Sequence, residues 1–191
     1  MASNRSRRER TRNELLERAL DLFERQGYEQ TSAAEVAAAA GVSEMTFFRH
    51  FPSKDQVLLD DPYDADLVAA VAARPVSEVP LVRTVNGLRS AWAAVPEPAV
   101  EVVRRRTRIV ASTPALRAAV ARNNQQTEDA VAEQLVADGC DRLEARVAVS
   151  AVLAALTSAL LWWAAEDQAD LSDAIERALR ILSPTAGRAA R

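Results

Sequence analysis

The sequence predicts an all-α protein with a small N-terminal helical domain and a larger helical C-terminal domain. Composition is the first reason, because only 5 of the 191 residues are glycine and 49% are hydrophobic, with abundant Ala, Leu and Val. The second reason is that apolar residues recur every three or four positions, which is the spacing of one helix face. The expected divisions are a flexible basic arm at 1–10, a three-helix domain at 11–55, a helical domain at 56–183 and a flexible tail at 184–191.

The N-terminal segment predicts a basic arm followed by a first helix. Five arginines lie at positions 5, 7, 8, 10 and 12, and a helix is expected at 12–26. Such an arm can reach DNA phosphates or can be a solvated, disordered tail, and both readings stay open. The acidic face of the following helix differs from the apolar stretch of a signal peptide, so we expect a cytoplasmic protein.

Two short helices crossing at a tight turn are expected between Thr31 and Lys54. Ser32 and Glu35 have the spacing of a capping box, and Ser43 can cap the second helix. Gly41 lies between the two helices, where a sharp turn needs a residue that tolerates positive φ. This pattern is a helix-turn-helix, whose second helix commonly enters the DNA major groove.

The second helix of this motif has an inner and an outer face. Phe47 and Phe51 are one turn apart and are expected to face inward. The outer positions are Glu44, Met45, Phe48, Arg49 and His50. Arg49 suits a guanine edge or a phosphate, Met45 a thymine methyl group and Glu44 a cytosine amine. The alternative is an ordinary helical hairpin in which the phenylalanines are core residues.

Residues 11–58 resemble the DNA-binding domain of the tetracycline-repressor (TetR) family of bacterial transcriptional regulators. The resemblance rests on the runs AGVS, TFFRHF and PSK after an N-terminal helix. It implies a DNA-contacting or DNA-positioning set of Thr31, Ser43, Glu44, Met45, Thr46, Phe48, Arg49, His50 and Lys54. The family usually has Tyr where this chain has Phe48, and often Gly where it has Met45, so the operator sequence of a relative does not transfer.

The same resemblance implies a homodimer on double-stranded DNA. A two-fold axis places two second helices in successive major grooves, about 34 Å apart, and so selects an approximately palindromic operator. Members of the family respond to small molecules and are mostly repressors, so we expect a repressor that an unknown small-molecule effector releases.

The middle of the chain predicts four helices. A helix starting at Lys54 is expected to break at Asp60–Pro62 before resuming at 63–73. This joint is either a candidate for signal transmission or a static break that Asp60 or Asp61 caps. Apolar stripes at 81–95 and 102–110 are separated by prolines, and a further helix is expected at 114–137.

Six residues of the C-terminal domain are candidates for a ligand pocket. They are Trp92, Arg106, Asn123, Thr127, Trp162 and Trp163. Arg106 interrupts an apolar stripe, where it can anchor an anion or pair with a nearby acid. Asn123 and Thr127 bring polar groups toward the interior, where they can orient a ligand or satisfy one another. The tryptophans suit a pocket wall or simple core packing.

The last two helices are expected to form the dimer interface. The uncharged run 147–165 approaches the length of a transmembrane helix, but its alanines and hydroxyl residues favour a helix buried on two sides. The second helix, 170–182, has a clear apolar stripe. In the resembled family these helices pair with their copies, so we expect a homodimer through residues 142–182 and no association with a membrane.

Catalysis is the main rival function, together with a helical adaptor that has no specific DNA contacts. His50 is the single histidine, and the sequence contains no phosphate-binding glycine loop and no His or Cys set with metal-ligand spacing. A carboxylate metal site at the run DDPYD is the remaining catalytic possibility. We therefore expect no enzyme activity, no cofactor and no bound metal.

Overall fold

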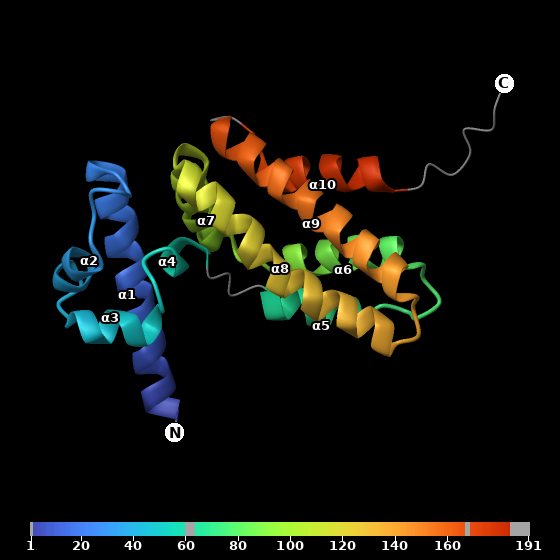
Figure 1. Ribbon diagram of the computed structural model, residues 1–191, viewed down its shortest axis with the longest axis horizontal. Helices are drawn as coiled ribbons and strands as arrows, with labels where there is room; N and C mark the ends of the chain where they lie inside the picture. The colour runs from blue at the N-terminus through green and yellow to red at the C-terminus, as the bar shows by residue number, and fades with distance from the viewer. Residues whose placement is uncertain (1, 60–63, 167–168, 184–191) are drawn as a thin grey trace. The chain divides into compact units, whose positions relative to one another are not determined.

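The computed structural model describes residues 2–59, 64–166 and 169–183. Ten α-helices and no strands occupy these residues, which confirms the predicted all-α class (Figure 1). The chain divides into two compact units, residues 1–60 with 105–120 and residues 61–104 with 121–191. The sequence predicted a boundary near residue 55 and did not predict that residues 105–120 join the first unit.

The first unit begins with a long helix, α1 (Ala2–Gln26). The structure makes residues 2–10 part of this helix, where the sequence predicted a flexible arm, so Arg7, Arg8 and Arg10 follow helical spacing. Gly27 adopts a φ of 90° directly after the helix. Because glycine has no Cβ, it reaches this left-handed conformation at little cost.

The predicted helix-turn-helix is confirmed in its caps and its turn. It consists of α2 (Ala33–Ala39) and α3 (Glu44–His50). Ser32 accepts from the Glu35 main-chain N–H, while the Glu35 carboxylate accepts from the Ser32 N–H, completing a capping box. Gly41 has a φ of 67°. Ser43 accepts a hydrogen bond from the Thr46 N–H and so caps α3.

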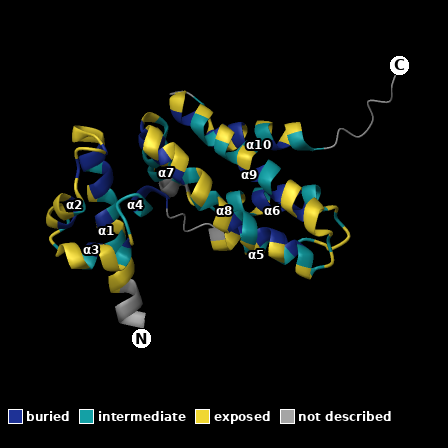
Figure 2. Cartoon of the chain, in the orientation of Figure 1, coloured by how far each residue is buried: buried dark blue, intermediate teal, exposed yellow. Residues whose placement is uncertain are grey.

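A small apolar core holds α1, α2, α3 and the short α4 (Gln56–Leu59) together. Leu15, Val36 and Phe47 are fully buried, and Phe51 is almost so. Their buried positions alternate with exposed ones at helical spacing along each element (Figure 2). Burial of the apolar face of each helix away from water therefore stabilises this unit.

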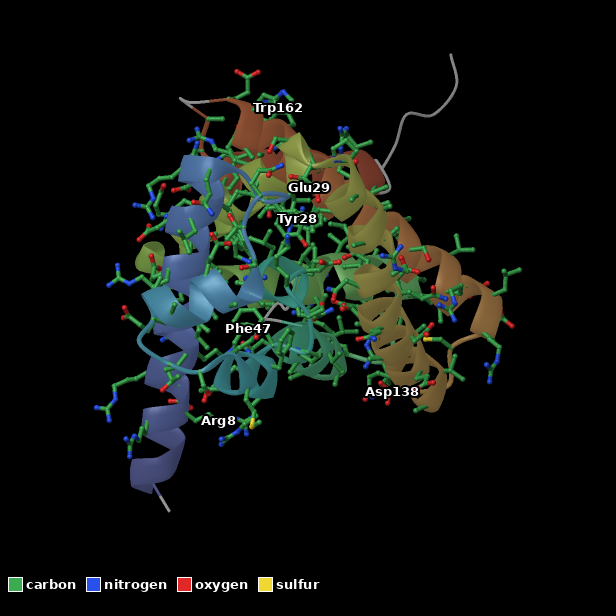
Figure 3. The ribbon with its side chains drawn as sticks, turned by 60° about the vertical axis from the view of Figure 1, so that its left-hand side comes forward. Arg8, Tyr28, Glu29, Phe47, Asp138 and Trp162 are labelled. Carbon is green, nitrogen blue, oxygen red and sulfur yellow. The ribbon has the colours of Figure 1, made fainter. Side chains whose placement is uncertain are left out.

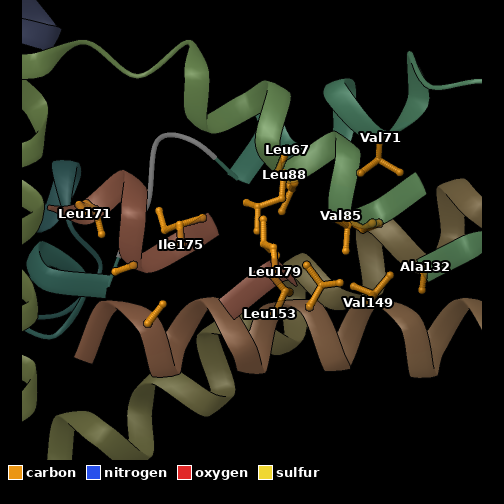
Figure 4. Packing of buried hydrophobic residues seen from close by; sticks show 14 of the residues in the cluster. Leu67, Val71, Val85, Leu88, Ala132, Val149, Leu153, Leu171, Ile175 and Leu179 are labelled. Carbon is orange, nitrogen blue, oxygen red and sulfur yellow. The ribbon is translucent and has the colours of Figure 1, made fainter. Parts of the chain in front are cut away.

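The second unit contains α5 (Asp64–Ala72), α6 (Pro80–Ala93), α9 (Arg142–Ala165) and α10 (Leu171–Leu182). It also contains parts of α7 (Glu97–Ser112) and α8 (Pro114–Ala137), because the unit boundaries fall after Arg104 and after Val120. Helix α9 packs against both α10 and α6, and α5 packs against α6. Figure 4 shows residues such as Leu88, Leu153, Ile175 and Leu179 meeting in the resulting core.

A buried arginine holds the start of α6 in this unit. The Arg83 side chain is fully buried, its Nε donates to the Val71 carbonyl at 3.1 Å, and its guanidinium pairs with Asp138. One turn later, a Cβ added to Gly87 would lie 2.4 Å from the Val71 Cγ2. Helices α5 and α6 therefore approach closely at a glycine, and a charged side chain closes one end of the contact.

Helix α9 is long and apolar enough to span a membrane by length and composition, as a core helix of a soluble protein can also be. Its inner stripe, including Ala145, Val149 and Val152, is buried against the rest of the unit. The predicted tail at 184–191 and the predicted break at Asp60–Pro62 lie outside the described residues. The side chains of the DDPYD run, residues 60–64, also lie outside the described part of the chain, and no group of metal-binding side chains occurs among the described residues.

Candidate nucleic-acid interface

Helix α3 is fixed from beneath by aromatic contacts. The Phe47 and Phe51 rings lie 5.8 Å apart, and both side chains are buried. Arg12 of α1 stacks over the Phe51 ring at 4.2 Å and donates from Nη1 to the His50 carbonyl at 2.9 Å. This bond satisfies a main-chain acceptor at the end of α3, so α1 fixes the helix at its C-terminus.

The outer face of α3 presents most of the predicted contacts to solvent. Glu44 and Arg49 are exposed, Met45 retains 75% of its accessible surface and Phe48 retains 46%. The Phe48 ring meets the buried Phe47 ring edge to face, with centroids 5.3 Å apart and an interplanar angle of 88°. The exposed face is therefore mixed, with two large apolar side chains beside one cation and one anion.

Four other residues of the predicted set hold the motif in shape. The Thr31 side chain is buried, and its hydroxyl donates to the Gly27 carbonyl at 2.8 Å. Ser43 and Thr46 bond to each other through their hydroxyls at 3.0 Å. Lys54 donates from Nζ to the Tyr28 and Thr31 carbonyls, each at 2.9 Å. These are positioning roles, and direct contact of these residues with DNA remains a prediction.

Tyr28 and Lys54 fasten the start of α4 to the loop between α1 and α2. The Lys54 ammonium lies 4.0 Å from the centre of the Tyr28 ring, and the Tyr28 hydroxyl donates to Asp55. Burial, followed by the hydrogen bond to Asp55, raises the pKa of Tyr28 well above its ordinary value, so the phenol stays protonated. Figure 3 shows Tyr28 in the loop that follows α1.

His50 lies in a strongly cationic environment at the end of α3. Partial burial and the nearby charges of Arg8, Arg12 and Arg49 lower the pKa of His50 below its ordinary value. Arg8, labelled in Figure 3, and Arg12 are one turn apart on α1. The sequence analysis placed Arg8 in a flexible arm and did not predict that it lies near His50. The four-residue spacing of Arg8 and Arg12 could have indicated that both lie on one face of a continuous helix.

Three consecutive arginines of α7 bind different partners. Arg104 stacks over the Trp163 ring at 4.1 Å and donates to the Ala169 carbonyl, both within the second unit. Arg105 pairs with three carboxylates of α1 in the first unit, those of Glu17, Asp21 and Glu24.

Arg106 also binds within the first unit. It donates from Nε and Nη2 to the Leu58 carbonyl of α4, at 2.9 and 2.6 Å. A predicted pocket cation is therefore attached to the helix that follows the DNA-binding motif.

The other predicted pocket residues lie in the second unit and do not share one environment. Trp163 is fully buried and donates from Nε1 to the Ala169 carbonyl at 3.1 Å, whereas its neighbour Trp162 is 45% exposed. Trp92 donates to the Ser172 hydroxyl. Thr127 is buried, Asn123 is half-buried, and the neighbouring Asn124 donates to Thr157 at 3.0 Å.

Helices α9 and α10 carry exposed apolar side chains in the range predicted for dimerisation. Leu143, Val147 and Trp162 are exposed on α9, and Ile181 of α10 is 84% exposed. The small residues Ala154 and Ser158 are exposed at the same helical spacing. Exposed large apolar residues on neighbouring helices are typical of a protein–protein interface.

Comparisons with known proteins agree with this geometry. Residues 15–60 match the sequence model of the tetR family of bacterial regulatory proteins, and residues 79–187 match that of the MftR C-terminal domain. The HTH-type transcriptional regulator TcmR of Streptomyces glaucescens is 36% identical over 140 residues, which are 69% of this chain and 62% of TcmR. The aligned part of this chain thus spans less than two thirds of that relative.

Two solved repressors have the same fold. SmeT of Stenotrophomonas maltophilia, the repressor of the multidrug efflux pump SmeDEF, has a TM-score of 0.56 and 18% identity, covering 90% of this chain and 87% of SmeT. NalD of Pseudomonas aeruginosa, the secondary repressor of the MexAB-OprM pump, has a TM-score of 0.55 and 21% identity, covering 91% of this chain and 94% of NalD.

Proposed function

Because the chain belongs to the tetR family of bacterial regulatory proteins, we propose that it is a dimeric, ligand-responsive transcriptional regulator that binds an approximately palindromic operator. The observation that carries this proposal is α3, a capped helix fixed by Phe47, Phe51 and Arg12, with an outer face open to a major groove. The family consists of transcriptional regulators and not of enzymes. A DNA-binding regulator acts where the chromosome is, so we place it in the cytoplasm.

Dimerisation is proposed through residues 142–182. The exposed apolar side chains of α9 and α10 support it, because two copies can bury them against each other. A two-fold dimer presents two α3 helices to half-sites about one helical turn of DNA apart. Each half-site alone binds weakly, and simultaneous docking makes the specific complex stable.

Effector release is proposed to act through α7 and α4. Arg104 binds within the second unit, while Arg105 and Arg106 bind α1 and α4 of the first. A shift of α7 on ligand binding would therefore move the helix that follows Lys54 and change the separation of the paired α3 helices.

SmeT has been solved as a triclosan complex, so the fold can hold a small molecule. A repressor needs only to occupy DNA, which is why we propose repression.

Selection from random duplexes tests the proposed function. Full-length protein is expected to enrich one approximately palindromic sequence, and anisotropy titrations with a scrambled duplex as competitor measure its specificity. Native mass spectrometry of the purified protein gives the subunit number and the mass of any bound small molecule. Equal binding to operator and scrambled duplex would favour the adaptor function instead. If a small molecule binds the protein but leaves its operator affinity unchanged, the proposed ligand response is contradicted.

Arg49→Ala is expected to weaken operator binding by about 1 to 3 kcal/mol and to relax sequence preference at one position of each half-site. The guanidinium is exposed beside the apolar face of α3, where it can bond a guanine edge. Titrations against operators varied at each position measure both effects. Arg117→Ala, at an exposed arginine of α8, is the matched control. Unchanged affinity in Arg49→Ala would remove this residue from the interface.

Operator affinity is expected to rise as the pH falls toward the lowered pKa of His50. In the free protein, partial burial and the three arginines lower the pKa of His50, so it is mostly neutral near pH 7. Bound phosphates favour the charged imidazolium and raise that pKa, so DNA binding takes up a proton. A single proton changes affinity by at most about tenfold per pH unit. His50→Gln is expected to flatten the profile, and matching profiles for both proteins would contradict the linkage.

A further inference from the structure

We infer that Met45 and Phe48 form one apolar surface on α3 that recognises the C5-methyl groups of thymines in each operator half-site. The inference rests on the proposed function and names the DNA feature that α3 selects. It differs from a general DNA-contacting role, because it assigns base recognition to the two positions where this chain departs from the residues usual in its family.

The two side chains lie on one face of α3, and the Phe48 ring is held in place. Positions 45 and 48 are three residues apart on α3, so their side chains lie on one face of the helix. The edge-to-face contact with buried Phe47 restricts the Phe48 ring, and α3 itself is fixed by Arg12 and by its Ser43 cap. The restricted Phe48 ring therefore loses little conformational freedom when it binds.

Charge identifies DNA as the occupant of this surface. Arg49 follows Phe48 directly, and Arg8 and Arg12 lie near His50 at the end of α3. A cationic border suits the phosphates on the edges of a major groove, while the apolar pair faces the base edges between them. Glu44 is exposed at the start of the helix, where a carboxylate can accept from an exposed base amine and is repelled by phosphates.

Base chemistry then selects thymine. The thymine methyl is the one apolar group that the four bases present in the major groove, and Met and Phe side chains offer it contact without a hydrogen bond. Phe48 has no hydroxyl to donate to a phosphate or a base, so its contribution depends on apolar contact. Removing the methyl group alone should therefore weaken binding, although every hydrogen-bonding group of the base pair stays in place.

Replacing thymine with deoxyuridine, one position at a time, in the selected operator tests this inference. Deoxyuridine lacks only the methyl group and pairs normally with adenine. One or two thymines per half-site are expected to show a loss of about three- to fivefold in affinity, the value expected for one buried methyl. If every substituted duplex binds within about twofold of the parent, the inference is overturned while the regulator function stands.

Protein variants locate the effect on α3. In Met45→Ala or Phe48→Ala, the penalty for the same deoxyuridine should shrink to less than about twofold, whereas Phe48→Tyr keeps the ring and should keep the penalty. Met45 and Phe48 are both exposed, so these variants are expected to fold, which circular dichroism checks. A penalty unchanged in both alanine variants would overturn the inference. A selection that enriches no sequence would overturn the proposed function and this inference together.

Discussion

Trp163→Ala is expected to lower the free energy of unfolding by about 3 to 5 kcal/mol, the range for a large buried aromatic replaced by alanine. Trp163 is fully buried in the second unit and packs within its apolar cluster. Its indole N–H donates to the Ala169 carbonyl, and Arg104 stacks over its ring. Truncation leaves a cavity, removes one of the two hydrogen bonds that the Ala169 carbonyl accepts and leaves Arg104 without its aromatic partner. Urea unfolding followed by circular dichroism measures the change.

Trp162→Ala is the matched control, because it changes the same residue type one position away on an exposed face. Its intrinsic cost is expected to be below about 1 kcal/mol, as for most surface substitutions. A role for Trp162 in the dimer would add a loss that grows on dilution of the protein. If both variants unfold at the same urea concentration under all conditions, Trp163 does not have the core role assigned here.

Ala154→Arg is expected to prevent dimerisation and to weaken operator binding by about 100-fold or more. Ala154 is exposed in the middle of the proposed interface on α9. A bulky cation there would have to be buried against its own copy across the two-fold axis, where like charges repel. Monomers bind each half-site separately and lose the gain from simultaneous docking, which commonly spans about 10² to 10⁴.

Light scattering after size exclusion reports the subunit number, and anisotropy reports operator affinity. Ala69→Arg on α5 is the control, since it adds the same side chain to another exposed helical alanine of the same unit. The control is expected to stay dimeric with normal affinity. A dimeric Ala154→Arg protein with normal operator binding would move the interface away from the centre of α9.

Helix positions were largely readable from the sequence, because local chemistry decides where helices begin and end. Pro114 and Ala137 bound α8 as predicted, and Asp170 caps α10 through the Asp173 N–H. The two serine caps of the helix-turn-helix form as predicted. Capping depends on residues within three positions of each other, so no distant contact is needed to identify it. The flexible arm predicted at 1–10 was wrong from residue 2 onward, where the structure has helix α1. Its arginines indicated charge, but the segment has no apolar stripe from which a helix could be predicted.

By itself, the sequence determined the all-α class, the helix-turn-helix with its caps and turn, and the inner and outer faces of α3. Tertiary structure alone decided which of two adjacent tryptophans enters the core, and that Arg106 binds the Leu58 carbonyl. It also decided that Arg12 fixes α3 and that residues 105–120 belong with the first unit. The physical reason is range: periodicity and capping act within a few residues, whereas the partner of a long charged or aromatic side chain is chosen by elements that meet only after folding.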